Sequence, residues 1–211
     1  MSIRTCAIGV LAAAALTACG NDRGGDDTAI GLMRQAVAGL GGSDSAQKPG
    51  ADAIARTALT RLKEPVMVAE IPANDAVAAL VPYGRNGSVE TWTTIDFQTV
   101  SLRGGRIVAT RGLGADLMAV SESGMRRTYH LMDAANGEMP VTVDCAPRIA
   151  GPEVITLAGG EVVRTTRVDE TCSGPDAEFV NQYWAGTDGG FRRSRQWIGP
   201  QSGYVELQRL R

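Results

Sequence analysis

Two short β-type runs joined by a pair of glycines constrain the fold of this chain more than any other feature. The runs cover residues 99–103 and 106–111, and Gly104 and Gly105 lie between them. Adjacent glycines supply the positive φ values that a two-residue hairpin turn needs. The stretch therefore predicts two antiparallel strands joined by a tight turn.

This turn also predicts the register of the two strands, because a short loop determines which residues face each other. Leu102 is expected opposite Ile107, and Val100 opposite Ala109. All four side chains are apolar, so the hairpin should bury one shared face.

The same pattern recurs twice downstream. Residues 154–165 repeat the β-type character around Gly159–Gly160, and residues 179–198 are divided by the turn-forming pair Asp188–Gly189. Links this short allow only antiparallel pairing. The chain is therefore predicted to form a meander of hairpins.

The rest of the chain extends this meander. Further strands are expected at residues 66–71, 127–133, 139–147, 153–158, 161–171, 179–185, 190–198 and 203–210. A helix should begin near Asp52 and end before Pro65. A helical turn is expected within residues 74–80, and a short helix or loop within 113–120. The predicted fold is mainly β, a large curved antiparallel meander sheet of half-barrel or sandwich-like form with one or two short N-terminal helices.

Length and charge narrow the class of protein. The chain has 211 residues, enough for a single β-rich domain over residues 51–211 with a substantial core. Its formal net charge is -2 and no run of Lys or Arg is present. Such a domain gains nothing from counterion release on a phosphate backbone, so we exclude nucleic acid as a partner.

The first residues predict the compartment. Arg4 precedes an apolar run at residues 6–15 that is too short to span a bilayer as a mature helix, so residues 1–18 are interpreted as a signal peptide. The run ends in Leu-Thr-Ala followed by Cys19, a lipobox that predicts acylation of Cys19, with palmitate among the chains. The alternative is an ordinary secretory signal in which Cys19 is incidental. Gly20 after the cysteine favours the outer membrane, with the domain facing the periplasm.

Residues 19–50 are predicted to be a lipidated tether, because glycine pairs and a Pro-Gly step punctuate them. One apolar stripe interrupts the tether at Ile30, Met33, Val37 and Leu40, which is the spacing of a short amphipathic helix. It would pack on the membrane or on the domain.

Four features together resemble the YjbF/GfcB family of lipoproteins, which is associated with group 4 capsule and exopolysaccharide secretion. They are the lipobox, Trp92 with the hairpin that closes at Gly112-Leu113-Gly114, the run Asn181-Gln182-Tyr183-Trp184, and the run from Arg193 to Gly199. The resemblance covers most of residues 60–211. It implies a non-enzymatic outer-membrane lipoprotein whose partners are a polysaccharide and the proteins that export it, and it carries over no catalytic residue, cofactor or metal ligand.

Cys145 and Cys172 are predicted to form a disulfide, since they lie on strands that flank the second hairpin and would meet an oxidising periplasm. The alternative is two free buried thiols. The resemblance does not imply this bridge.

The single histidine, His130, restricts the enzyme classes that the chain can belong to. A His-rich zinc site is excluded, and a Ser-His-Asp triad would need His130 without a Gly-x-Ser-x-Gly elbow. Two acid pairs would remain for a periplasmic glycan hydrolase, Asp133 with Glu138 and Asp169 with Glu170. We favour a protein that is not an enzyme.

Aromatic residues with polar neighbours are the candidates for contact with a glycan or a partner. They are Trp92, Tyr183, Trp184 and Trp197, together with Arg195. Flat rings of this kind can stack on sugars, although the same rings can equally fill the core of the sheet. The further functional alternative is a carrier of lipid or another hydrophobic ligand, because a curled antiparallel sheet is also similar to the LolA/LolB type of fold.

Overall fold

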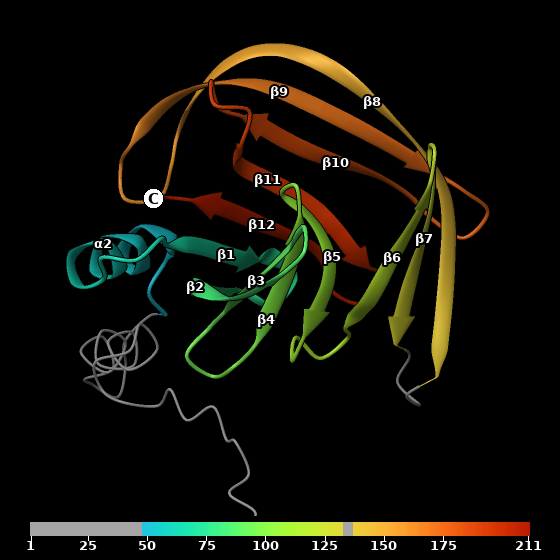
Figure 1. The fold of residues 1–211 in the computed structure, drawn as a ribbon, viewed down its shortest axis with the longest axis horizontal. Helices are drawn as coiled ribbons and strands as arrows, with labels where there is room; N and C mark the ends of the chain where they lie inside the picture. Colours follow the sequence, from blue (N-terminus) through green and yellow to red (C-terminus); the bar gives the residue numbers. More distant parts are fainter. Residues whose placement is uncertain (1–47, 133–136) are drawn as a thin grey trace, which may run out of the picture.

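The computed structural model describes residues 48–132 and 137–211, and it consists of one curled antiparallel sheet with a helix against its outer face (Figure 1). Twelve strands follow the order β5-β4-β3-β2-β1-β12-β11-β10-β9-β8-β7-β6. The mainly β, antiparallel fold predicted from the sequence is confirmed. The signal peptide, Cys19, the stripe from Ile30 to Leu40, and Asp133 lie outside the described residues.

The elements have the following bounds. They are α2 Ala51–Arg61, β1 Met67–Ile71, the 3-10 helix η1 Pro72–Asn74, β2 Ala76–Asn86, β3 Val89–Thr93, β4 Thr99–Arg103, β5 Arg106–Arg111, β6 Leu117–Ser123, β7 Arg126–Met132, β8 Glu138–Thr156, β9 Val162–Ser173, β10 Glu178–Ala185, β11 Phe191–Gly199 and β12 Gly203–Arg209. Every pair of neighbouring strands is antiparallel.

All three predicted hairpins form, but the register of the first is corrected by a bulge. Leu102 pairs with Ile107 as expected, whereas Val100 pairs with Thr110 and not with Ala109. The register shifts by one residue because Val108 is an extra residue on β5. Ile107 and Val108 are both buried as a result.

Three local predictions were wrong. Residues 76–86 form strand β2 where a helical turn was expected, and β6 replaces the helix or loop expected within 113–120. The two strands predicted at 139–147 and 153–158 are one strand, β8, which bends at a bulge near Gly151. Short alanine-rich or interrupted runs carry a weak local signal, and pairing with the neighbouring strand decides their conformation.

Helix α2 closes part of the outer face of the sheet. It begins after Gly50, which occupies the N-cap position expected for Asp52, while the Asp52 carboxylate accepts a hydrogen bond of 3.2 Å from Gly159 N. The apolar side of the helix packs on strands β1 and β2 and on the β8–β9 turn. In the described part of the chain, no helix has the length and apolar character that crossing a membrane requires.

The main core fills the inside of the curled sheet. Its largest aromatic group joins three strands, since Trp197 stacks on Phe179 with 4.4 Å between ring centroids and Tyr129 meets Trp197 edge-on at 5.3 Å. The wide-open concave face that a carrier of a hydrophobic ligand would need is therefore largely occupied by side chains.

The two ends of the sheet approach each other, so the sheet is nearly closed. Thr110 on β5 donates to the carboxylate of Asp116 at 3.0 Å and accepts a hydrogen bond from Leu117 N at 3.0 Å. Gln196 on β11 binds the β4–β5 end across the interior of the sheet. Its side chain accepts a hydrogen bond from Ile107 N at 2.8 Å and donates one to Gly105 O at 2.9 Å.

Candidate functional site

The inside of the sheet contains a buried carboxylate held by arginines from distant strands. Glu170 on β9 is completely buried, and Arg127 on β7 donates to its two oxygens at 2.5 and 2.6 Å. Arg106 on β5 lies 3.6 Å from the same carboxylate. Since Arg127 and Arg106 come from near the two ends of the strand order, Glu170 links both ends of the nearly closed sheet.

Neutral side chains complete the shell around this carboxylate. Asn181 and the Tyr183 hydroxyl, both on β10, donate to Glu170 Oε2 at 3.2 Å each. Asn181 also accepts from Trp197 N at 2.8 Å. A buried charge is tolerated only when it is paired and hydrogen-bonded, and this shell meets both requirements.

The electrostatics follow from this shell. Burial acts to raise the pKa of Glu170, but the hydrogen bonds and charge of Arg127, with help from Asn181 and Arg106, outweigh it and lower the pKa below the ordinary carboxyl value. Burial raises the pKa of the Tyr183 hydroxyl, and the Glu170 charge adds to this effect. Glu170 is therefore an ionised acceptor and Tyr183 a neutral donor.

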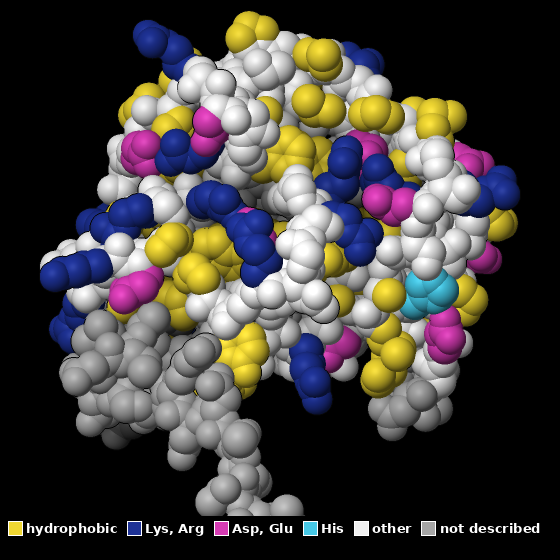
Figure 2. All heavy atoms as spheres, viewed as in Figure 1, with side chains coloured by type: hydrophobic (Ala, Val, Ile, Leu, Met, Phe, Trp, Pro, Cys, Tyr) yellow, Lys and Arg dark blue, Asp and Glu magenta, His cyan; other side chains and the backbone are white. Residues whose placement is uncertain are grey.

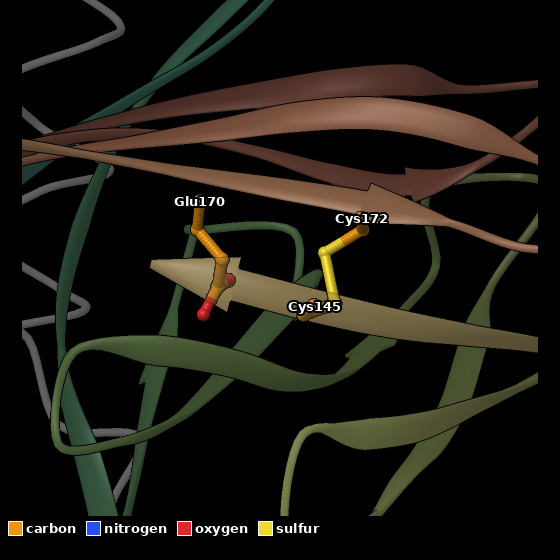
Figure 3. Close-up of side chains that lie close together, drawn as sticks. All are labelled: Cys145, Glu170 and Cys172. Carbon is orange, nitrogen blue, oxygen red and sulfur yellow. A yellow bond between two sulfur atoms is a disulfide. The ribbon is translucent and has the colours of Figure 1, made fainter. Parts of the chain in front are cut away.

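The disulfide predicted from the sequence lies beside this carboxylate. Cys145 and Cys172 face each other on β8 and β9, with an S–S distance of 2.05 Å. Figure 3 shows the bridge and the Glu170 side chain on the same side of the two strands. These three residues form a compact group of metal-ligand types, with candidate ligand atoms within 4.8 Å of one another. The sulfurs are bonded to each other and Arg127 holds the carboxylate, so the group does not fit a metal ion.

A second arrangement of reactive side chains lies on the surface of three neighbouring strands. Ser121 Oγ lies 3.0 Å from His130 Nε2, and His130 Nδ1 lies 2.5 Å from Glu138 Oε1. This is the order of groups in a serine hydrolase triad. The side chains of His130 and Glu138 are 29% and 57% exposed, however, so water competes for each bond. The three residues form a hydrogen-bond ladder open to solvent, unlike the dry, preorganised sites in which such chemistry is efficient.

The candidate acid pairs of a glycan hydrolase are not assembled. Asp169 and Glu170 are neighbours on β9, where successive side chains point to opposite faces. Asp169 is bound by Arg167 at 3.1 Å on the outer side, whereas Glu170 is bound by Arg127 inside. Glu138 is paired with His130, and its predicted partner Asp133 lies outside the described residues.

The predicted aromatic platform is also not assembled, because its rings fill the two cores. Trp92 and Trp197 belong to the main core, and Trp184 packs with α2 on the outer side. Tyr183 is buried against Glu170 inside the sheet. Each of these four side chains is at most 8% exposed, so none offers a face to a sugar. The alternative interpretation, that these residues are core, is the one that the structure bears out.

Arg195 lies on the outer face of the sheet. Its guanidinium is 3.4 Å from the centre of the Tyr204 ring and 3.7 Å from Glu206, which also binds Arg193 at 2.8 Å. On the face shown in Figure 2, acidic side chains likewise lie among the basic ones. The positive charge of Arg195 is thus partly neutralised by Glu206, and an anionic partner would have to compete with Glu206 for this arginine.

An apolar cavity opens at one end of the sheet interior. Its volume is about 290 Å³, and its walls come from the inner faces of β1, β2, β4 and β12. The apolar lining comprises Pro49, Ala69, Ile71, Ala76, Val77, Ala78, Leu80, Val100, Leu113 and Val205. Lys48 and Pro49, where the described chain begins, lie at the same cavity, so the N-terminal segment joins the domain there.

Comparison with known protein families shows which family this chain belongs to. The family described as group 4 capsule polysaccharide lipoprotein GfcB, YjbF matches residues 36–210. The chain belongs to the YjbF family. It is therefore a lipoprotein of a family linked to capsule polysaccharide, and the resemblance inferred from the sequence is confirmed.

A solved structure of another lipoprotein shares the fold of this chain. The hypothetical lipoprotein YmcC from Escherichia coli K12 aligns with a TM-score of 0.62 at 20% identity, over 79% of this chain and 98% of that chain. A putative exported protein with a YmcC-like fold from Bacteroides fragilis aligns with a TM-score of 0.34 at 10% identity, over 71% and 95%. No curated protein matches the chain.

Sequence reasoning missed the role of Glu170, Arg127 and Arg106. Glu170 is predicted only as half of a candidate acid pair with Asp169, and no role is predicted for either arginine. The one available signal was the run Thr-Arg-Val-Asp-Glu-Thr-Cys at residues 166–172, which places Glu170 in phase with Cys172. Residues two apart on a strand share a face, so a buried cysteine predicts an inward glutamate.

Proposed function

We propose that this protein is a lipid-anchored, non-enzymatic accessory factor for capsule or exopolysaccharide export at the outer membrane. It acts by binding the glycan or proteins of the export machinery. The observation that supports this role is the match of the YjbF family across residues 36–210, which includes nearly all of the described domain. Acylation of Cys19 would hold the domain at the periplasmic side of the membrane.

The chemistry of the buried site argues against catalysis there. A general acid needs a pKa raised toward neutral pH, whereas the arginines lower the pKa of Glu170 and occupy both of its oxygens. The surface ladder of Ser121, His130 and Glu138 is open to water. Both the Glu170 cluster and the surface ladder therefore have the arrangement of groups that stabilise the sheet.

The experiment compares secreted polysaccharide in a deletion strain complemented with the wild type, with Cys19→Ser or with Cys6→Ser. Cys6 lies inside the apolar run of the signal peptide and serves as the matched control. We expect the deletion to lower secreted polysaccharide, and the wild type and Cys6→Ser to restore it. Cys19→Ser should not restore it, and membrane fractionation should find less of this variant than of the wild type in the outer-membrane fraction. An unchanged amount of polysaccharide in the deletion strain would refute the proposal.

A further inference from the structure

The apolar cavity exists because side chains on the inner face become smaller toward one end of the sheet. Met67 on β1 faces Leu80 on β2, and this pair is buried in the main core. Two residues further on, Ala69 faces Ala78, and the next inner pair is Ile71 with Ala76. Three alanines thus occupy positions where larger side chains would fill the core. The space that those larger side chains would take is the cavity.

The walls of the cavity leave it suited to an apolar occupant. Most of the lining residues are alanine, valine, leucine, isoleucine or proline, and the polar ones are Lys48, Asp75, Thr94 and Gln98. Cavities lined by aliphatic side chains stay dry and take up apolar molecules, whereas water needs two or more polar partners. An apolar ligand with a polar end therefore fits better than water or a sugar.

Hydrogen bonds fix the loop that carries Leu113 at the edge of the cavity. The Asp116 carboxylate accepts from Gly112 N at 2.8 Å and from Leu113 N at 3.1 Å, which holds Leu113 at the cavity. Gln98 joins the same loop to the β3–β4 turn by donating to Gly112 O at 3.0 Å. In that turn Phe97 is 52% exposed and has a φ of 60°. Backbone conformations of this kind are held in place by the surrounding structure, here by the hydrogen bonds of Thr94 and Gln98 in the same turn.

The location of the cavity, where the N-terminal segment enters the domain, suggests a lipid as its ligand. Lys48 and Pro49 border the cavity, and the segment that precedes them leads back to Cys19, 29 residues away from Lys48. A lipoprotein of this family therefore carries the cavity at the point where its membrane-attached segment enters the domain. We infer that the cavity binds one fatty acyl chain. This site is independent of the proposed export role, which does not require it.

The volume predicts how much of the chain is bound. A cavity of about 150 Å³ with similar walls accommodates benzene, so the cavity of about 290 Å³ should hold roughly a dozen carbon atoms. Each buried methylene should raise affinity about fourfold.

The first experiment titrates saturated fatty acids of 8 to 16 carbons against the full mature chain carrying Cys19→Ser, and follows displacement of 11-dansylaminoundecanoic acid. We expect saturable binding of one molecule per chain. Affinity should rise about fourfold per methylene up to about 12 carbons and then level off. Absence of saturable binding, or affinity that does not depend on chain length, would overturn the inference.

A pair of variants tests the location. Ala78→Leu fills the cavity and should weaken binding of dodecanoic acid at least tenfold, whereas Ala146→Leu, at an exposed position on β8, should leave it unchanged. Thermal unfolding checks that Ala78→Leu is folded, and its midpoint should not fall because the added side chain occupies empty space. If this variant does not fold, Ala76→Leu near the mouth replaces it. Wild-type affinity in a folded, cavity-filled variant would overturn the assignment.

A final comparison distinguishes the two sources of such a chain, the protein's own lipid at Cys19 and a separate membrane lipid. The acylated protein in lipid nanodiscs is titrated with the same dansyl probe. If only the Cys19→Ser form binds the probe, the protein's own acyl chain occupies the cavity. If both forms bind it, the ligand is a separate lipid. Both results support the site, and failure of both forms to bind would refute it.

Discussion

At the scale of single residues, Glu170 shows how a nearly closed sheet accommodates one internal charge. Each of its oxygens receives a guanidinium hydrogen from Arg127, and Asn181 and Tyr183 supply two further donors. An ion pair of this kind adds little stability over apolar residues of the same size. Loss of Glu170, however, would remove the buried counter-charge of Arg127 and leave it only the more exposed Glu122, at 3.2 Å. The cluster is therefore sensitive to single substitutions.

Glu170→Gln should lower the free energy of unfolding by about 3 kcal/mol at pH 7, because Arg127 and Arg106 lose their shared counter-charge. Urea unfolding monitored by circular dichroism measures the loss. Glu178→Gln, at an exposed position on the neighbouring strand, is the matched control and should stay near the wild-type value. Equal stability of the two variants would contradict the role of Glu170.

The same residue predicts a dependence on pH. The pKa of Glu170 is lower in the folded protein than in the unfolded chain, so its contribution is complete above the ordinary carboxyl pKa. It is lost as pH falls through the lower, folded value. The difference in stability between the wild type and Glu170→Gln should therefore shrink between pH 5 and more acidic conditions, as unfolding curves over this range would show.

At the scale of elements, β8 and β9 form the longest hairpin of the structure, and two features at different points along it control its shape. A register shift near Gly151 bends β8, which arches over the sheet in Figure 1. Toward the other end, the disulfide joins the directly opposed Cys145 and Cys172. The bend directs the tip of the hairpin toward α2, where Leu157 and Ala158 pack against the helix cluster.

Replacing both Cys145 and Cys172 by alanine should lower the free energy of unfolding by roughly 3.5 kcal/mol in the chain-entropy estimate for a separation of 27 residues. The unfolded chain gains conformational freedom, while the buried alanines leave the native pairing intact. Urea unfolding without reductant measures the change. The wild type with reductant should approach the variant, and an unchanged wild-type midpoint under reduction would argue against a stabilising bridge.

At the scale of the whole molecule, closure depends on polar contacts between strands that are far apart in the strand order. Gln196 on β11 binds backbone groups at the β4–β5 turn, and Arg106 next to that turn reaches Glu170. At the other end, Arg127 draws β7 toward the same carboxylate. The interior network thus holds both edges of a sheet whose end strands would otherwise be less constrained.

Gln196→Leu should loosen the β4–β5 end of the sheet more than the rest. The substitution leaves Ile107 N and Gly105 O without their partner, at a cost of about 2 kcal/mol. Hydrogen exchange should accelerate at least tenfold within residues 99–111 compared with β9 and β10. Gln201→Leu, in the exposed β11–β12 turn, is the control. A uniform acceleration over all strands would show that Gln196 does not act on this end specifically.

The sequence by itself determined the meander, the lipoprotein class and the cysteine pair. Turn-forming glycines and alternating side chains act over a few residues, so hairpins such as β4–β5 and β10–β11 could be predicted locally. Only the tertiary structure decided the pairing of β1 with β12, the burial of Trp92 and Trp197, and the contact between Arg127 and Glu170 across 43 residues. These contacts depend on how far the sheet curls, which is a sum of many small twists and bulges that no short segment specifies.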